Sequence, residues 1–293
     1  PAMNANEYIT WRRWAHYNAN PTAYTPGNQP SREQDETFFS SLDETSFNNV
    51  MRGWSGNNWN GSNVLNTNWG DFVTKTGVTQ EHTISASGGT DMIKSFFSLG
   101  YLNNEGTQIG QSYERYNVSM STDIKPTAWF TLGGSINTSW SNQSYGYSRT
   151  GQSSSSGPTE IYAAAKQIVN IAQPYDADGE IILTPSNMNG VYTVIDEWNK
   201  SDEQRQTLRA LGSFYANVDL GEIWSPLSGL NFKTNFGPDF RFFRRGIYID
   251  KTSAVRQGGT SYASWNYDRR FSWVLDNIVT YNKEINDHKF DIT

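Results

Sequence analysis

The clearest strand in the sequence reads Leu208-Arg209-Ala210-Leu211-Gly212-Ser213-Phe214-Tyr215-Ala216-Asn217-Val218-Asp219-Leu220. Every second residue from Leu208 to Leu220 is apolar or glycine, and the residues between them are mostly polar. Successive side chains of a β-strand point to opposite faces, so this alternation predicts a strand with one apolar and one polar face. The turn Ser225-Pro226-Leu227-Ser228-Gly229 follows, and the alternation resumes at Leu230.

The same period of two recurs along the chain. It predicts further strands in residues 82–87, 93–101, 116–121, 130–140, 230–236, 270–281 and 288–293. Tight turns and long connections alternate between these strands. The tight turns lie at 88–91, 125–128, 225–229 and 282–287, and the long connections at 103–112, 141–206 and 244–269. An up-and-down sheet with tight turns at one edge and long loops at the other is typical of outer-membrane β-barrels.

Aromatic residues gather near the ends of the predicted strands. Trp129 and Trp224 lie beside short turns, whereas Tyr101, Trp140 and Trp273 lie toward the long-loop side. Two girdles of aromatic rings at the membrane interfaces would produce this distribution. We therefore predict that these five residues form the interfacial girdles.

A soluble β-sandwich is the alternative fold, because a sheet with one face in solvent also alternates. The predicted strands favour the barrel, since several reach about ten residues, the length that a tilted transmembrane strand needs. Sandwich strands average nearer five or six residues. The corresponding alternative function is a secreted β-sandwich domain that binds or hydrolyses glycans.

Composition excludes several classes of protein. The net charge of −6 and the pI of about 5.1 argue against nucleic-acid binding, which needs a basic surface. The 293 residues contain no cysteine, which removes disulfides, thiol nucleophiles and zinc–thiolate sites. The mean hydropathy of −0.67 fits no transmembrane helix but is compatible with barrel strands.

The predicted organisation has four parts. Residues 1–79 form a loop region with an N-terminal helix, 80–140 barrel strands, 141–206 a long loop with a helix, and 207–293 barrel strands with a further loop. We expect 1–79 and both later loops to be extracellular, and the chain to be a piece of a longer polypeptide.

The long loop at 141–206 begins with a Ser-rich run, 148–157, and Pro158 then opens a predicted helix. Loops of this length are usually functional or disordered. We expect the apolar helix face, with Ile161, Ala165 and Ile168, to pack on the barrel rim or on a partner.

Neither a metal site nor a catalytic site is predicted. Asp176-Ala177-Asp178-Gly179-Glu180 begins like a calcium loop, but Asn187 occupies the position where an EF-hand has its bidentate Glu. A D-G turn is the simpler interpretation. The three histidines are far apart in sequence, and no pair of carboxylates can be nominated for glycan hydrolysis. We therefore expect no enzyme activity and no cofactor.

Aromatic residues in the predicted loops are candidates for substrate contact. Each is flanked by Asn, Ser, Gly or Arg, and rings beside such groups suit sugar or peptide binding. The candidates are Trp54, Trp59, Tyr145, Tyr147, Trp265 and Tyr267. The competing interpretation is that these rings cap the barrel or contact a partner.

Two blocks of sequence carry a family resemblance. They read Asn68-Trp69-Gly70-Asp71-Phe72-Val73-Thr74-Lys75-Thr76-Gly77-Val78-Thr79-Gln80-Glu81-His82-Thr83-Ile84-Ser85-Ala86-Ser87-Gly88-Gly89 and Phe96-Phe97-Ser98-Leu99-Gly100-Tyr101-Leu102-Asn103-Asn104-Glu105-Gly106. Both resemble the barrel of SusC/RagA-type TonB-dependent outer-membrane transporters. Gly70 stands where that family's pattern often has Gln. Asn4-Ala5-Asn6-Glu7-Tyr8 is similar to the family's helix start, with Ala5 replacing the usual Gly.

The resemblance implies a barrel of about 22 strands in the outer membrane of a Gram-negative bacterium. It further implies an N-terminal plug energised by the TonB system, and a SusD-like surface lipoprotein as a lid. Together these parts import oligosaccharides or peptides. No plug is recognisable in this chain, and its predicted strands would leave edges that lipid does not tolerate.

Overall fold

The fold was analysed in a computed structural model of the chain. The structure describes residues 3–19, 24–25, 28–147, 160–256, 258–285 and 288–293. The predicted run 148–157 and Pro158 lie outside the described residues. The predicted N-terminal helix is present as α1 (Ala5–Asn18), and Asn4 and Glu7 cap its start reciprocally.

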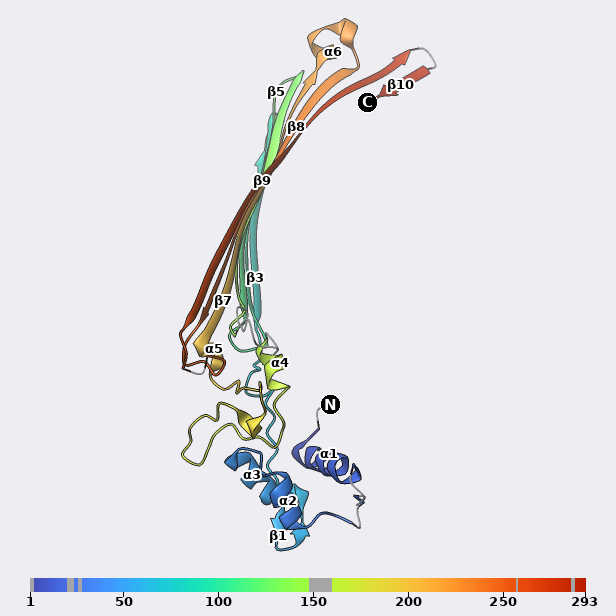
Figure 1. Cartoon of the computed structure of the whole chain (residues 1–293). Coiled ribbons are helices and arrows are strands. Elements are labelled where there is room, and N and C mark those ends of the chain that lie inside the picture. The colour runs from blue at the N-terminus through green and yellow to red at the C-terminus, as the bar shows by residue number, and fades with distance from the viewer. Residues whose placement is uncertain (1–2, 20–23, 26–27, 148–159, 257, 286–287) are drawn as a thin grey trace.

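Eight strands form one antiparallel sheet whose order follows the chain, and β3 and β10 are its edges. The strands are β3 (Thr79–Gly89), β4 (Ile93–Glu105), β5 (Ser112–Thr127), β6 (Phe130–Ser144), β7 (Ser201–Asp219), β8 (Leu230–Ile249), β9 (Tyr262–Ile285) and β10 (His288–Ile292). Figure 1 shows them as a long curved sheet that does not close on itself. The predicted all-β, up-and-down arrangement is confirmed.

The short connections lie toward one end of the sheet. The turn holding α6 (Leu220–Ile223) and η3 (Ser225–Leu227) lies at the same end as β10, and the other helices lie at the opposite end (Figure 1). Gly229 closes the α6 turn at φ +92°, where a Cβ atom would meet the backbone of Asn282. The predicted alternation of short turns and long connections is therefore present.

Several strands extend farther than the sequence pattern indicated. β7 begins at Ser201, inside the predicted 141–206 loop, and β8 continues to Ile249, inside the predicted 244–269 loop. β9 begins at Tyr262 and runs for 24 residues. These extensions are held by continuous pairing, from Ser201 opposite Ile249 to Ile249 opposite Tyr262. Charged residues and glycine interrupt the alternation of apolar and polar residues in these segments, so the sequence pattern did not predict them as strands.

The register places one set of side chains on an apolar face. Paired positions run across it from His82 through Tyr101, Tyr116 and Trp140 to Leu208. The exposed large side chains on this face include Ile84, Leu99, Met120, Leu132, Ile136, Phe214, Phe236, Phe271, Leu275 and Val279. The other face carries mainly Ser, Thr, Asn and charged residues, with exposed Phe96, Leu211 and Val274 as exceptions.

The described hydrophobic cores lie outside most of the sheet. Among the described residues, Ile247 and Ile249 are the buried large apolar side chains that come from the eight strands. A sandwich would bury the apolar face of each sheet against the other. The open, exposed apolar face therefore contradicts the sandwich alternative.

The connections at the long-loop end contain the remaining elements. These are α1, α2 (Arg32–Phe38), α3 (Glu44–Met51), β1 (Trp54–Ser55), β2 (Asn58–Trp59), η1 (Gly61–Asn63), α4 (Ile161–Ala165), η2 (Pro185–Asn187) and α5 (Glu197–Lys200). They fold around two hydrophobic clusters, one containing Trp69 and Ile161 and the other Ile9 and Val50. Among the described residues, no helix is long and apolar enough to cross a membrane.

Candidate functional site on the polar face of the sheet

Three arginines lie side by side across the polar face of the sheet. Arg209 of β7 pairs in register with Arg241 of β8, and Arg241 pairs with Arg270 of β9. Directly opposed side chains have Cβ atoms about 5 Å apart. The three side chains therefore start from neighbouring positions on one face, and we refer to these residues as the three-arginine row.

One carboxylate compensates part of this charge. Arg209 binds Asp239 in a bidentate manner, with Nε 3.0 Å and Nη2 2.7 Å from the two carboxylate oxygens. Within the described part of the chain, no carboxylate forms an ion pair with Arg241 or Arg270, and both side chains are exposed. The Arg241 guanidinium lies 5.7 Å from the ring centroid of Phe243. The row therefore carries excess positive charge.

A second pair of arginines lies nearer the long-loop end of the same face. Arg205 and Arg245 are directly paired, and both donate to Oε1 of the buried Glu203, with Nε atoms at 2.9 and 2.8 Å. Nη1 of Arg205 also donates to the Tyr145 hydroxyl at 3.0 Å. We refer to Arg205 and Arg245 as the two-arginine row.

Tyr145 also lines a pocket of about 230 Å³ at the long-loop end of the polar face. Four side-chain amides contribute to its wall, from Asn104, Gln108, Gln111 and Gln143. Amides can donate and accept hydrogen bonds at once, as sugar hydroxyls and peptide groups require. The pocket supports the prediction that Tyr145 contacts substrate, which stays a prediction.

Sequence reasoning missed both arginine rows. The sequence signals were Arg241, Arg244 and Arg245 in one strand, with Arg205 and Arg209 in another. These residues fell partly in the predicted loops, and the alternation alone does not give the register between strands. Only the pairing shows which arginines share a face.

Trp54 and Trp59 form a structural cluster with a buried ion pair. The guanidinium of Arg13 lies 3.8 Å from the Trp59 ring centroid and 5.7 Å from that of Trp54. Asp35 binds Arg13 through both carboxylate oxygens and accepts a 3.0 Å hydrogen bond from Nε1 of Trp54. Trp54 is buried, so its ring contacts protein and not solvent. This position gives no support to the prediction that Trp54 contacts substrate.

The apolar helix face of the long loop is covered by the loop region itself. Ile161, Ala165 and Ile168 pack in one buried cluster with Trp69 and with Tyr147, which is 4% exposed. Tyr147 follows the end of β6, so this cluster lies at the long-loop end of the sheet and covers the helix face without a partner. Packing on the barrel rim stays a prediction. Tyr147, predicted to contact substrate, is part of the same interior.

Trp265 and Tyr267 do not lie in a loop. Both belong to β9 and lie on the apolar face, where they are 60% and 65% exposed. Trp265 stacks with the guanidinium of Arg244, 4.3 Å from the ring centroid. The prediction that both rings lie in a loop is therefore wrong, because they belong to a strand. Their contact with substrate stays a prediction.

The five predicted girdle residues are distributed as follows. Trp129 and Trp224 lie at the short-turn end, 40% and 61% exposed. Tyr101 and Trp140 flank Tyr116, with ring centroids 4.9 and 5.7 Å from that of Tyr116. Trp273 lies on the same apolar face of β9, opposite Pro238. Barrel strands are tilted, so paired rows run obliquely to a membrane plane, and the girdle role stays a prediction.

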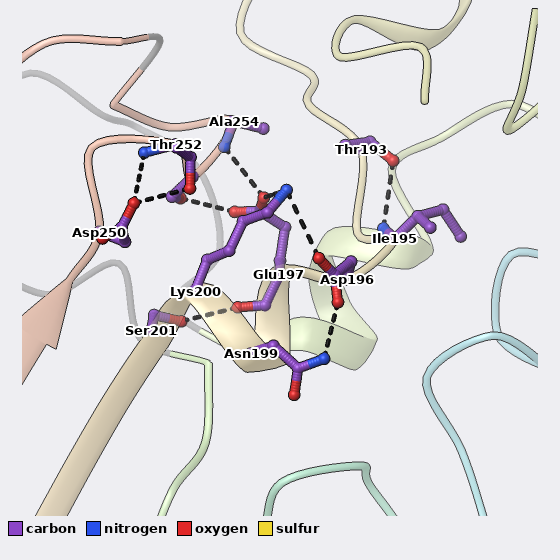
Figure 2. A network of polar contacts seen from close by, with 11 residues as sticks. Thr193, Ile195, Asp196, Glu197, Asn199, Lys200, Ser201, Asp250, Thr252 and Ala254 are labelled. Carbon is purple, nitrogen blue, oxygen red and sulfur yellow. Dashed lines mark hydrogen bonds and ion pairs between the residues drawn. The ribbon is translucent and has the colours of Figure 1, made fainter. Parts of the chain in front are cut away.

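Glu197 of α5 fastens the β8–β9 connection to the segment that precedes β7. Its carboxylate accepts hydrogen bonds from Oγ of Ser253 at 2.6 Å and from the backbone N–H of Ala254 at 3.0 Å (Figure 2). Burial raises the pKa of Glu197, although these two donors and nearby Lys200 oppose the shift. The contacts join two long connections into one structure at this end of the sheet.

Asp250 stabilises the start of the same connection. It accepts hydrogen bonds from the hydroxyl and N–H of Thr252, at 2.6 and 2.8 Å, and from the Tyr248 hydroxyl at 2.8 Å. These donors lower the pKa of Asp250 to about 2. Its carboxylate is therefore charged at neutral pH and orders the turn (Figure 2).

The predicted D-G turn is present at Asp176. Oδ1 of Asp176 accepts from the backbone N–H groups of Asp178 at 3.0 Å and Glu180 at 2.9 Å, while Gly179 adopts φ +86°. The described ranges contain no group of three or more His, Asp or Glu residues placed to hold a metal ion.

Searches against known proteins give sequence relatives but no family model that matches the chain. The chain is 25% identical over 253 residues to TonB-dependent receptor P3 of Formosa agariphila, covering 86% of this chain and 24% of that protein. It is 23% identical over 249 residues to TonB-dependent receptor SusC of Bacteroides thetaiotaomicron, covering 78% of this chain and 23% of that protein. The chain spans about a quarter of the length of these relatives.

Solved structures agree on the fold. A structure of the RagAB peptide transporter aligns with a TM-score of 0.57 at 18% identity, over 76% of this chain and 24% of the other. The closed-closed state of the RagAB peptide importer aligns with a TM-score of 0.52 at 17% identity, over 84% of this chain and 30% of the other. In sequence and in fold, the chain is similar to a barrel segment of the SusC/RagA-type TonB-dependent outer-membrane transporters.

Proposed function

We propose that this chain is a segment of an outer-membrane TonB-dependent transporter that imports glycans or peptides. The single observation that carries the proposal is the exposed apolar face, which continues across the sheet. Soluble monomers rarely expose contiguous apolar patches of more than a few hundred Å². Lipid on one face and water on the other account for both faces of the sheet.

The proposal also fixes an orientation. The short turns face the periplasm, and the long connections, with residues 1–79 and 141–206, form the extracellular mouth. The strands β7, β8 and β9 have 19, 20 and 24 residues. A membrane crossing needs about 9–11 residues, so these strands project beyond the lipid.

The folded connections would receive a SusD-like lipoprotein lid, and the TonB system would act through a plug domain elsewhere in the longer protein. The family resemblance supports both partners. Trp11 and Trp14 of α1 offer a contact surface, because they are 45% and 56% exposed on the helical region. Exposed tryptophans are frequent anchors of protein interfaces.

Replacing Trp11 and Trp14 together by alanine is expected to reduce co-purification of the lipoprotein with the full-length transporter by about tenfold or more. Both rings are exposed, so the fold should be retained. The matched control is Trp224→Ala, which removes an exposed tryptophan at the short-turn end. Equal recovery of the lipoprotein with both variants would remove α1 from the lid interface.

The transport proposal is tested by uptake in cells that produce the full-length protein. Uptake of a labelled oligosaccharide or peptide mixture is expected to require the gene and to stop when TonB is deleted. An unheated gel sample should migrate differently from a heated one, because a closed barrel resists the detergent. A protein that fractionates as soluble and shows neither behaviour would contradict the proposal.

A further inference from the structure

We propose that the two arginine rows bind anionic groups of the imported molecule, so that the substrate is an oligosaccharide or peptide bearing carboxylate or sulfate groups. The inference rests on the proposed function, because it takes the polar face of the sheet as the inside of the barrel. It adds a substrate class and names the residues that recognise it.

The three-arginine row is unfavourable in the absence of a counter-charge. Like charges directly opposite one another on paired strands are destabilising, and here the opposition occurs twice in succession. Asp239 forms its close ion pair with Arg209 and acts on Arg241 and Arg270 only from farther away, so one carboxylate faces three exposed or partly exposed guanidinium groups. An anion placed over Arg241 and Arg270 would remove the repulsion.

The polar face of β7 to β9 is basic at its long-loop side, although the whole chain is acidic. Five arginines there face three carboxylates, which are those of Glu203, Asp239 and Asp268. The net charge of the chain is −6. A local field of opposite sign, inside a channel with low-dielectric walls, concentrates anionic ligands.

The geometry fits planar oxyanions. Arginine presents a fixed fork of donors that binds carboxylate, sulfate or phosphate oxygens in pairs. The two rows are four residues apart along β7 and β8, which corresponds to about 13 Å in a strand. Phe243 lies between Arg241 and Arg245 on the same face. A chain molecule with two anionic groups could thus contact both rows and the ring.

A sixth arginine supports the same assignment. Arg115 of β5 lies on the polar face, in a register row that runs through Ser141 and Thr207 to Phe243. Its Nε is buried and has no hydrogen-bond partner within the described residues. Its guanidinium, which is always charged, adds a further positive charge to the polar face.

The position of the rows favours substrate over an internal domain of the same protein. The two-arginine row contacts Tyr145, which lines the amide-rich pocket at the long-loop end. Under the proposed orientation this is the end where substrate enters. Acidic residues of a plug domain are the competing counter-charge, and the experiment below distinguishes them.

The test uses the purified full-length transporter and two pairs of probes. One pair is hexagalacturonate with neutral maltohexaose, and the other is a glutamate-rich peptide with the same peptide carrying glutamine. The test variant is Arg241→Gln with Arg270→Gln. The matched control is Arg244→Gln with Arg269→Gln, which changes the same two strands on the opposite, apolar face.

At least one acidic probe is expected to bind about tenfold or more tightly than its neutral counterpart. The test variant should lose about tenfold or more of that affinity, while the control should retain it. Binding should weaken as salt rises from about 0.05 to 0.5 M, because salt screens exposed charges. The pair that responds identifies the source of the anionic group as glycan or peptide.

Several outcomes would overturn the inference. These are equal binding of acidic and neutral probes, no binding of either acidic probe, or unchanged affinity in the test variant. A test variant that keeps ligand binding but loses thermal stability would assign the arginines to the plug. If the glutamine variant does not fold, Arg241→Lys with Arg270→Lys serves instead, because lysine keeps the charge but cannot bind an oxyanion through two parallel donors. Unchanged affinity of the lysine variant for the acidic probes would then count against the inference. Energised uptake of a neutral substrate alone would refute this inference and leave the transport proposal intact.

Discussion

Replacing Arg13 by alanine is expected to destabilise the folded helical region around α1 and α2 by about 3–5 kcal/mol. The substitution leaves the Asp35 carboxylate buried with one remaining donor, Nε1 of Trp54. It also removes the guanidinium that lies against the Trp54 and Trp59 rings. Burial of a charge without its partner is among the costliest single changes in a protein.

Hydrogen exchange of the amides in α1 and α2 measures this effect in the full-length protein. Local protection should fall by about two to four orders of magnitude, following the free energy lost. Arg12→Ala is the matched control, because its side chain is exposed one residue away. Combined Arg13→Met and Asp35→Leu should recover most of the protection, since it leaves no buried charge. Similar exchange in the Arg12 and Arg13 variants would contradict the role of the ion pair.

Placing an arginine at Ile136 is expected to cost about 2–4 kcal/mol of barrel stability, the range for a cation near the middle of the lipid-facing surface. Ile136 lies on the apolar face between Met120 and Gly212 of the neighbouring strands. The control is Asn137→Arg, which puts the same side chain on the polar face one residue later. Water on that face should make the control close to neutral.

Denaturant titration of the full-length protein in lipid vesicles gives the two free energies of unfolding. Ile136→Arg is expected to be the more destabilising substitution. A larger loss for Asn137→Arg would mean that the assignment of the two faces is inverted. Equal losses would mean that neither face of β6 contacts lipid.

The general architecture could be predicted from the sequence because it depends on local patterns. The alternation from Leu208 to Leu220 and the turn at Ser225 to Gly229 specify a two-faced strand and its reversal without reference to distant residues. The strand ends were harder to predict. The paired segment that starts at Tyr262 carries asparagine, aspartate and arginine, so polar residues concealed that it belongs to the sheet.

The candidate sites depend on contacts that no local pattern reports. Asp35 forms hydrogen bonds with Arg13 and Trp54, which lie 22 and 19 residues away in the sequence. The sequence alone therefore showed only tryptophans in a predicted loop. Arg209, Arg241 and Arg270 become neighbours only through the register of three strands. A slip of one residue would send an arginine to the opposite face.

The central claim, that this sheet crosses the outer membrane with its short turns in the periplasm, is tested most directly by labelling single cysteines in living cells. The segment contains no cysteine. In a full-length protein whose other cysteines are replaced by serine, Asn189→Cys in a long connection and Thr90→Cys or Ser228→Cys in short turns each provide a single labelling site. All three positions are exposed. A membrane-impermeant maleimide should label Asn189→Cys in intact cells, and the two turn variants only after the outer membrane is permeabilised. Labelling of the turn variants in intact cells, or protection of Asn189→Cys, would contradict the account.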